Sequence, residues 1–319
     1  MFILAPARLI MSISDQVARN NKMKNVHPGL PDFDYVRPKT LEDASQFLAS
    51  HEGDSRPFLG GTDTFIRMRD GEVNEKYLVD VKKLEGLDEI SFDTSTGLTV
   101  GAAVSMNQVS AFPEVKEYYP VLAEAIDSVA SYQLRTRATV IGNICNASPA
   151  GDTIGVCLLL DGELNVYGID GERKEPLKTF FLGPGQTVLK TGDIVTSLQL
   201  PVPPRGAAGK YLKHGRNKRG DLSIVGVAVI GYPDEEIESG FRFKLALTSV
   251  ASVPLVVEEV EEFLAGTKID EESFTEAARI AMDVCDPIDD VRSSARYRRM
   301  MVRNLSRRAM TEVWGVVSQ

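Results

Sequence analysis

The chain has 319 residues, of which 43% are hydrophobic and 25% charged, an ordinary composition for a globular protein with room for two domains. Its formal net charge of −9 argues against nucleic-acid binding and against docking on anionic membranes. Three widely spaced cysteines, Cys145, Cys157 and Cys285, exclude a disulfide framework and a complete cysteine-ligated cluster, and they favour a reducing, cytoplasmic setting.

The N-terminal half alternates short strands with turns and helices. Residues 1–32 are predicted to form an N-terminal extension ending in a loop, after which Thr40 caps a helix. A second helix is predicted from Val121 to Gln133, where apolar residues recur at helical spacing. Strands are predicted at 57–59, ahead of a Gly-Gly turn, at 77–81, and in two hairpins at 90–100 and 164–171.

The best linker in the chain is 201–206, because proline this dense stops any regular element. It predicts a boundary between a first domain at 33–205 and a second at 206–319. Two strands and then three helices follow, which is typical of an α+β domain. The strands are expected at Ser223–Ile230 and Phe241–Val250, and the helices from Pro254, over Glu271–Asp283, and from Ser293 to about Val313.

One candidate binding segment is Phe58 to Thr64, read Phe-Leu-Gly-Gly-Thr-Asp-Thr. Paired glycines after a short strand let the backbone take a positive φ and approach a ligand closely, so that successive N–H groups can face one anion. The alternative is a tight turn with polar residues on the surface.

A second candidate is 135–152, a stretch of small and polar residues between two apolar regions. A long loop of small residues suits a cofactor surface, because the backbone must come close to the ligand there. The alternative is an irregular connection without a ligand.

Several other chemistries are excluded. The chain has no G-x-G-x-x-G or P-loop motif and no apolar run of the about 20 residues that a membrane helix needs. No signal peptide is predicted at its mildly apolar start. Its histidines, His27, His51 and His214, lack zinc-site spacing, and His214 is expected to be structural or exposed. No catalytic residue and no metal ligand is predicted.

Six segments in chain order resemble the medium, FAD-binding subunit of the xanthine dehydrogenase family of molybdenum hydroxylases, which includes carbon monoxide dehydrogenase and hydroxybenzoyl-CoA reductase. Together they run from about residue 33 to 310. They are Phe33–Ala44; the glycine turn Phe58–Asp63; Ala138–Asp152; Gly192–Val195 with Leu200-Pro201; Lys213, Arg216 and Asp221; and Asp286–Arg292 with Tyr297-Arg298-Arg299.

The resemblance implies an α+β fold, with an FAD-binding domain of the vanillyl-alcohol-oxidase (PCMH) type and then a smaller domain of β-sheet plus helices, of the CO dehydrogenase flavoprotein C-terminal type. It implies non-covalent FAD, since neither histidine nor cysteine occurs in the first loop. The residues that it assigns to FAD are Phe58, Leu59, Gly60, Gly61, Thr62, Asp63, Thr64, Val129, Thr139, Val140, Gly142, Asn143, Asp152, Val195 and Lys213.

The chain departs from the family pattern at three points. Ile141 replaces one of the paired glycines of the second loop. Isoleucine disfavours positive φ and adds bulk where the backbone usually comes near phosphate, which predicts a local shift of the loop or weaker FAD binding. Val129 stands where an aromatic residue can lie beside the cofactor, and it cannot stack. The cysteine-rich insertion that carries a [4Fe-4S] cluster in hydroxybenzoyl-CoA reductase is missing.

By the resemblance, electrons from a molybdopterin centre on a large subunit pass through [2Fe-2S] clusters of a small subunit to FAD and on to an external acceptor. Because the chain contains neither a molybdopterin nor a [2Fe-2S] sequence, those cofactors are expected on partner chains, in a heterotrimer or a dimer of heterotrimers. Two alternatives stay open: a stand-alone FAD-dependent oxidoreductase of the same fold, or a non-catalytic assembly module that has lost flavin.

A row of arginines is predicted on one face of the last helix, at Arg292, Arg296, Arg299, Arg303 and Arg307. It is read as a solvated basic face. The alternatives are a contact with an acidic helix, such as 258–262, or with a partner subunit.

Overall fold

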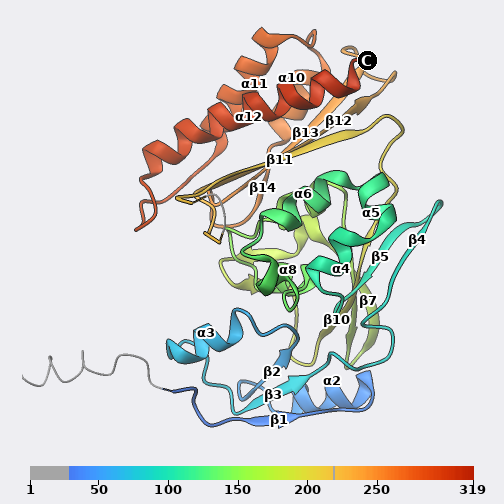
Figure 1. The fold of residues 1–319 in the computed structure, drawn as a ribbon, viewed down its shortest axis with the longest axis vertical. Coiled ribbons are helices and arrows are strands. Elements are labelled where there is room, and N and C mark those ends of the chain that lie inside the picture. The colour runs from blue at the N-terminus through green and yellow to red at the C-terminus, as the bar shows by residue number, and fades with distance from the viewer. Residues whose placement is uncertain (1–28, 218–219) are drawn as a thin grey trace, which may run out of the picture.

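The structure is a computed structural model that describes residues 29–217 and 220–319. Most of the predicted N-terminal extension, residues 1–28, therefore lies outside the described residues. The described chain forms three successive sheet-based units, which Figure 1 shows from the blue N-terminal strands to the red C-terminal helices. None of the described helices is both long and apolar enough to span a membrane.

The N-terminal unit is a small parallel sheet of strand order β1-β3-β2. Thr40 caps the first helix as predicted, with its Oγ1 accepting the N–H of Asp43 at 3.0 Å. Helix α2 packs Ala44 and Leu48 against Val79, while α3 packs Met68 against Phe58 and Leu78. The elements are β1 (Asp34–Val36), α2 (Leu41–Ser50), β2 (Ser55–Phe58), α3 (Thr64–Arg69) and β3 (Tyr77–Asp80).

The middle unit is built on a five-stranded antiparallel sheet of order β4-β5-β10-β6-β7. Both predicted hairpins are confirmed in it. Its strands are β4 (Ile90–Asp93), β5 (Gly97–Gly101), β6 (Glu163–Gly168), β7 (Gly171–Pro176) and β10 (Ile194–Leu200). A short connection holds the 3-10 turn η1 (Leu177–Thr179) and the pair β8 (Phe181–Gly183) and β9 (Gln186–Thr187).

The helices of the middle unit correct two predictions. The helix expected from Val121 to Gln133 is interrupted, because Ala130 takes a φ of +43° and Ser131 caps a new helix. The stretch 135–152 is not one loop, because it contains a short helix that begins after Thr139. These helices are α4 (Met106–Ala111), α5 (Pro113–Tyr118), α6 (Pro120–Ser128), α7 (Tyr132–Arg135), α8 (Val140–Cys145) and α9 (Ile154–Leu159).

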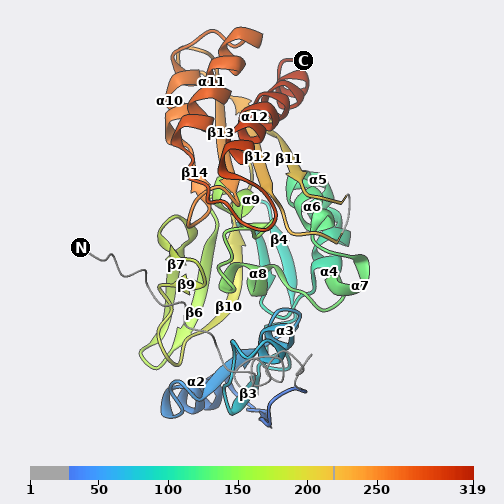
Figure 2. The same cartoon turned by 90° about the vertical axis from the view of Figure 1, so that its left-hand side faces the viewer.

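The C-terminal unit follows the irregular 201–206 segment and has a four-stranded antiparallel sheet covered by three helices (Figures 1 and 2). Pro254 does not begin a helix, because Leu255 and Val256 first pair with the edge of β13. The elements are β11 (Ala208–His214), β12 (Val225–Pro233), β13 (Phe241–Thr248), β14 (Leu255–Val256), α10 (Glu258–Ala265), α11 (Glu271–Val284) and α12 (Ala295–Val317).

The middle and C-terminal units share buried surface. Helix α9 and helix α6 both pack against the C-terminal sheet on the face opposite α10–α12. Ala228, Ile230 and Ala246 of that sheet belong to the core of the middle unit. A domain boundary at 201–206 stays a prediction, and the two units on either side of it are joined by this apolar contact.

The arginine row only partly follows the prediction. Arg292 precedes α12, so it does not lie on the helix. Arg307 pairs with Glu271 of α11 at 3.2 Å, whereas the acidic segment 258–262 pairs with Lys178 and Arg242 instead. A contact with segment 258–262 itself is therefore wrong for the described residues, although Arg307 does contact an acidic helix, α11, and a partner contact stays a prediction.

Candidate cofactor-binding site

A cleft of about 550 Å³ lies between the N-terminal and middle units. That volume is within the range of about 300–1,000 Å³ that small-molecule sites occupy. Both segments singled out in the sequence line it. The predicted residues on its walls are Leu59, Gly60, Gly61, Thr62, Asp63, Thr64, Val129, Thr139, Gly142, Asn143, Asp152 and Val195.

Three predicted residues do not line the cleft but stand directly behind its walls. Phe58 and Val140 are buried in the hydrophobic cores. Lys213 lies on β11, and its ammonium group points to Asp152. If these residues affect a ligand, they do so through the wall residues that they support.

The glycine turn after β2 depends on each glycine for a different reason. Gly61 has a φ of +71°, and a side chain on it would collide with the ring of Phe58. A Cβ on Gly60 would overlap the carbonyl oxygen of Arg137, so this glycine lets the first segment pack against the second. The turn thus forms one continuous wall with the beginning of the second segment.

The turn lines the cleft, and its backbone has donors without a partner among the described residues. Among the described residues, the N–H groups of residues 60–64 donate none of the hydrogen bonds found. Consecutive N–H groups without an acceptor form a concave site for an anion, because each unpaired donor is costly to leave unsatisfied. Asp63 sits beside them, and partial desolvation raises the pKa of its carboxyl group although Arg67 lowers it.

The second segment owes its shape to Thr139. Its Oγ1 accepts the N–H of Gly142 at 2.8 Å and so caps α8. One turn further, Asn143 accepts the hydroxyl of Thr153 at 2.8 Å through its Oδ1, which fixes the amide at the cleft wall. The polar groups of this wall are therefore held in place without a ligand.

Ile141 does not distort the second segment. It lies within α8, where its backbone is helical, and its side chain is buried in the core of the middle unit. The expected conflict with a positive φ does not arise at this position. The positive-φ reason given for weaker FAD binding is therefore wrong. Ile141 does line the cleft, so the effect of its bulk there, and the affinity itself, stay open to measurement.

Behind the cleft lies a buried network around Asp152. This carboxylate is 6% exposed and accepts the ammonium group of Lys213 and the hydroxyl of Tyr211, each at 2.7 Å. Burial raises the pKa of Asp152, and the nearby Lys213 and Tyr211 counteract that effect. Lys213 also donates to the carbonyl of Ser128 at 3.1 Å, which ties β11 to the end of α6.

The cleft also includes residues that the sequence did not single out. Ala130, in its left-handed conformation, lies next to Val129 on the wall, and Asp221 and Leu222 enter from the loop before β12. Asp221 was noted in a family-like segment without a role. The left-handed conformation of Ala130 could not be predicted from the sequence, because the helical spacing of apolar residues continues across this position.

The described histidine, cysteine and acidic side chains form no metal site. Within residues 29–217 and 220–319, no three His, Cys, Asp or Glu side chains gather as a metal site would require. His214 lies 3.1 Å from the hydroxyl of Tyr297, a contact that is consistent with the structural role expected for it.

Comparisons with known proteins agree on one family. Residues 31–203 match the model of the FAD binding domain in molybdopterin dehydrogenase, and residues 210–313 match the CO dehydrogenase flavoprotein C-terminal domain. The carbon monoxide dehydrogenase medium chain of Hydrogenophaga pseudoflava is 29% identical over 89% of this chain and 98% of its own length. The putative xanthine dehydrogenase FAD-binding subunit of Escherichia coli is 26% identical over 87% and 94%.

Solved structures agree. A carbon monoxide dehydrogenase from Hydrogenophaga pseudoflava, lacking the Mo-pyranopterin moiety of its molybdenum cofactor, superposes with a TM-score of 0.85 at 28% identity. That match covers 89% of this chain and 98% of the other. The expected α+β fold, with its two named domain types, is thereby confirmed. The chain belongs to the FAD-binding family of the molybdopterin dehydrogenases, as the medium, flavoprotein subunit of an oxidoreductase of the molybdenum hydroxylase type.

Proposed function

We propose that the chain is an electron-transfer subunit that holds FAD in the cleft and hands on electrons delivered by a partner subunit. The observation that carries this proposal is the row of N–H groups at residues 60–64 that have no partner in the described part of the chain, which suits the negatively charged pyrophosphate of a dinucleotide. When bound, FAD supplies the redox chemistry, accepting electrons from [2Fe-2S] clusters and releasing them to an external acceptor.

The residues present fit such a cofactor. Gly60 and Gly61 bring backbone within reach of phosphate, and the hydroxyls of Thr62 and Thr64 lie on the same wall. Thr139, Gly142 and Asn143 belong to the adjoining wall, and Val129, Asp152 and Val195 also line the cleft. Phe58, Val140 and Lys213 would support these walls from behind.

We further propose that the attachment is non-covalent. Residues 58–64 contain neither histidine nor cysteine. Cys145 does line the cleft, but burial raises the pKa of its thiol to about 12, so almost no thiolate is present at neutral pH. A covalent bond to the flavin through this sulfur is therefore disfavoured.

The partners in this proposal are a large molybdopterin-binding subunit and a small [2Fe-2S] subunit, in a heterotrimer or a dimer of heterotrimers. Two relatives are named medium chains, of a carbon monoxide dehydrogenase and a glyceraldehyde dehydrogenase, which supports a place beside other chains. The free cysteines, two of them buried, support a reducing, cytoplasmic location.

The test begins with the chain expressed alone. The purified protein is expected to be yellow, to show the two visible absorption bands of oxidised flavin, and to release unmodified FAD on denaturation. A folded protein that stays colourless after incubation with FAD would refute the proposed site. Expression beside its neighbouring reading frames is then expected to yield a complex containing molybdenum and iron.

The same experiment separates the alternatives. Substrate oxidation by the isolated yellow chain would favour a stand-alone oxidoreductase. A colourless chain that still co-purifies with metal-containing partners would favour an assembly module without flavin. In the proposed case, the isolated chain is yellow and inactive toward substrate, and the complex is active.

A further inference from the structure

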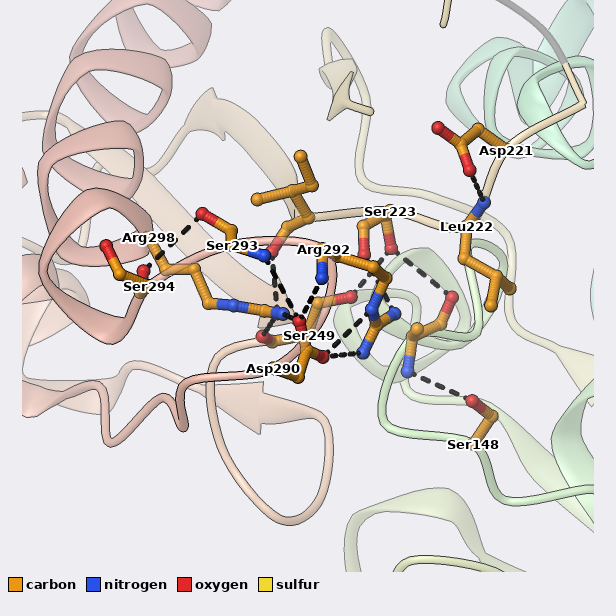
Figure 3. Close-up of polar contacts among 12 residues, drawn as sticks. Ser148, Asp221, Leu222, Ser223, Ser249, Asp290, Arg292, Ser293, Ser294 and Arg298 are labelled. Atoms are coloured by element: carbon orange, nitrogen blue, oxygen red, sulfur yellow. Dashed lines mark hydrogen bonds and ion pairs between the residues drawn. The ribbon is translucent and has the colours of Figure 1, made fainter. Parts of the chain in front are cut away.

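The C-terminal unit contributes an ionic cluster of one buried and two partly buried side chains next to the cleft wall. Arg298 of α12 is only 1% exposed and lies with its Nη2 2.7 Å from Oδ1 of Asp290. Arg292 binds the other carboxylate oxygen of Asp290 through Nε at 2.9 Å and Nη2 at 2.6 Å. Figure 3 shows Asp290 between the two guanidinium groups.

The carboxylate of Asp290 is the group that both arginines of this cluster contact. Oδ1 of Asp290 also accepts the backbone N–H groups of Arg292 and Ser293, at 2.8 and 3.2 Å. Although burial acts in the opposite direction, the hydrogen bonds and charge of Arg292 and the contact with Arg298 lower the pKa of Asp290, which keeps it charged at neutral pH. The N–H groups of Arg298 are not aimed at the carboxylate, so that contact is an ion pair.

The free ends of both arginines reach backbone carbonyls of the loops next to the cleft. Nη1 of Arg298 donates to the carbonyls of Ser249 at 2.7 Å and Ile224 at 3.0 Å. Nη1 of Arg292 donates to the carbonyl of Ser223 at 3.3 Å. Ser223 and Ile224 directly follow Asp221 and Leu222, which line the cleft.

Ser249 connects Arg298 to the second cleft segment. It has a φ of +68°, a left-handed conformation that places its carbonyl on Arg298 and its N–H on the carbonyl of Pro149, at 2.7 Å. Its hydroxyl lies 2.7 Å from that of Ser223, which is placed to donate to the carbonyl of Ala150 at 3.4 Å. Ser148, Ala150 and Asp152 lie on the cleft wall.

We infer that Asp290, Arg292 and Arg298 are positioning residues for the cofactor site, through which the C-terminal unit holds the Ser148–Asp152 and Asp221–Ser223 walls in their binding geometry. None of the three lines the cleft, so they act on the ligand through the residues that they hold, Ser223, Ile224 and Ser249. This inference rests on the FAD function proposed above. It makes the C-terminal unit part of the binding site.

The test uses the full chain and free FAD. Asp290→Asn keeps the shape of the side chain and removes its charge, while Arg292→Gln removes the outer guanidinium and leaves the Arg298–Asp290 pair. Each is expected to weaken FAD binding by about tenfold, as when the supports of a site are removed, and to alter the visible circular dichroism of bound flavin. Amide hydrogen exchange at residues 148–152 is expected to accelerate even without FAD.

The matched control is Arg242→Gln. Arg242 lies on β13 of the same sheet and also binds two carboxylates, Asp234 at 2.8 Å and Glu261 at 2.6 Å, but it lines no part of the cleft. It is expected to lose stability without weakening FAD binding. If Asp290→Asn fails to fold by far-ultraviolet circular dichroism, Arg292→Gln, which alters a more exposed group, decides the matter.

Two results would overturn the inference. One is a folded Arg292→Gln protein with wild-type FAD affinity and wild-type exchange at 148–152. The other is an Arg242→Gln protein that loses FAD affinity to the same extent, because the effect would then be one of general stability. If the wild-type chain binds no FAD, the proposed function fails, and the exchange rates of the flavin-free proteins still decide whether the cluster holds the wall.

Discussion

At the scale of single residues, Gly60 has the sharpest consequence. Because a Cβ there would overlap the carbonyl oxygen of Arg137, Gly60→Ala must push the glycine turn away from the beginning of the second segment. We expect a loss of about 1–3 kcal/mol in the free energy of unfolding, as for other overpacked sites, and FAD binding weakened by about tenfold or more. Absorbance titration of the purified proteins with FAD measures the second effect.

Gly266→Ala is the control for this substitution. Nothing lies within 4 Å of the Cβ it would add, and its φ is outside the left-handed region. It is expected to leave both stability and FAD affinity unchanged. A Gly60→Ala protein with the affinity of this control would contradict the role given to the close approach.

The Lys213–Asp152 pair predicts a pH-dependent stability. Burial already raises the pKa of Asp152, and Lys213→Met removes the cation that counteracts it. A carboxyl group whose pKa is raised on folding stabilises the protein when protonated, and this stabilisation is lost as the pH rises through the folded-state value. The loss caused by Lys213→Met is therefore expected to be larger at about pH 8 than at about pH 5, and to approach about 3 kcal/mol.

Urea unfolding at both pH values measures this difference. Lys244→Met is the comparison, because Lys244 pairs at 2.9 Å with Asp161, which is largely exposed, and such pairs contribute about 0–1 kcal/mol. A loss for Lys213→Met that is equal at the two pH values would mean that Asp152 does not govern it.

The residue types in the sequence predicted which segments line the cleft, but not the structural role of each residue in them. The Gly-Gly and small-residue segments were identified because positive φ and close approach restrict the residues allowed there. Ile141 was misjudged, because a single sequence does not reveal that α8 is already helical at that position. The need for Gly60 comes from Arg137, which is distant along the chain, so local sequence gives no sign of it.

At the scale of elements, the N-terminal cap of α8 is expected to contribute both to the stability of the protein and to its affinity for FAD. Thr139→Ala removes the acceptor for the N–H of Gly142 and is expected to lower the free energy of unfolding by about 1 kcal/mol. Because the first turn of α8 lines the cleft, FAD affinity should fall as well. Thr139→Ser, which keeps the hydroxyl, should restore both, as measured by thermal unfolding and flavin titration.

Thr40→Ala separates the two effects. Thr40 caps α2 with the same kind of bond, to the N–H of Asp43 at 3.0 Å, but it does not line the cleft. It is expected to cost a similar stability and to leave FAD affinity unchanged. Equal losses of affinity in both alanine variants would show that the α8 cap has no special link to the site.

Elements defined by local chemistry were predicted well, and those defined by packing were not. The Thr40 cap and both hairpins follow from nearby residues. The break after Ser128 was missed because apolar spacing continues across it, while the left-handed Ala130 is imposed by the surrounding structure. The strand at Leu255 was missed because its pairing with Leu247 is a tertiary contact.

At the scale of the whole molecule, the apolar contact of α9 with the C-terminal sheet predicts one cooperative unfolding transition. Trp314, the single tryptophan of the chain, packs among Phe241, Phe243 and Phe274, so its fluorescence reports on the C-terminal unit. Circular dichroism reports on the whole chain. The two thermal transitions are expected to coincide. A separate, earlier change in fluorescence would mean that the units unfold independently.

The ionic cluster around Asp290 has a consequence for the order of synthesis. The glycine turn and α8 leave the ribosome first. Asp290, Arg292 and Arg298, which hold the cleft walls in place, are synthesised only after the whole C-terminal sheet. In the nascent chain, the segments that line the cleft are therefore present before the residues that hold them in their binding geometry. Cofactor loading should then be a late event in maturation, following the docking of α12 rather than the folding of the segments that touch the flavin.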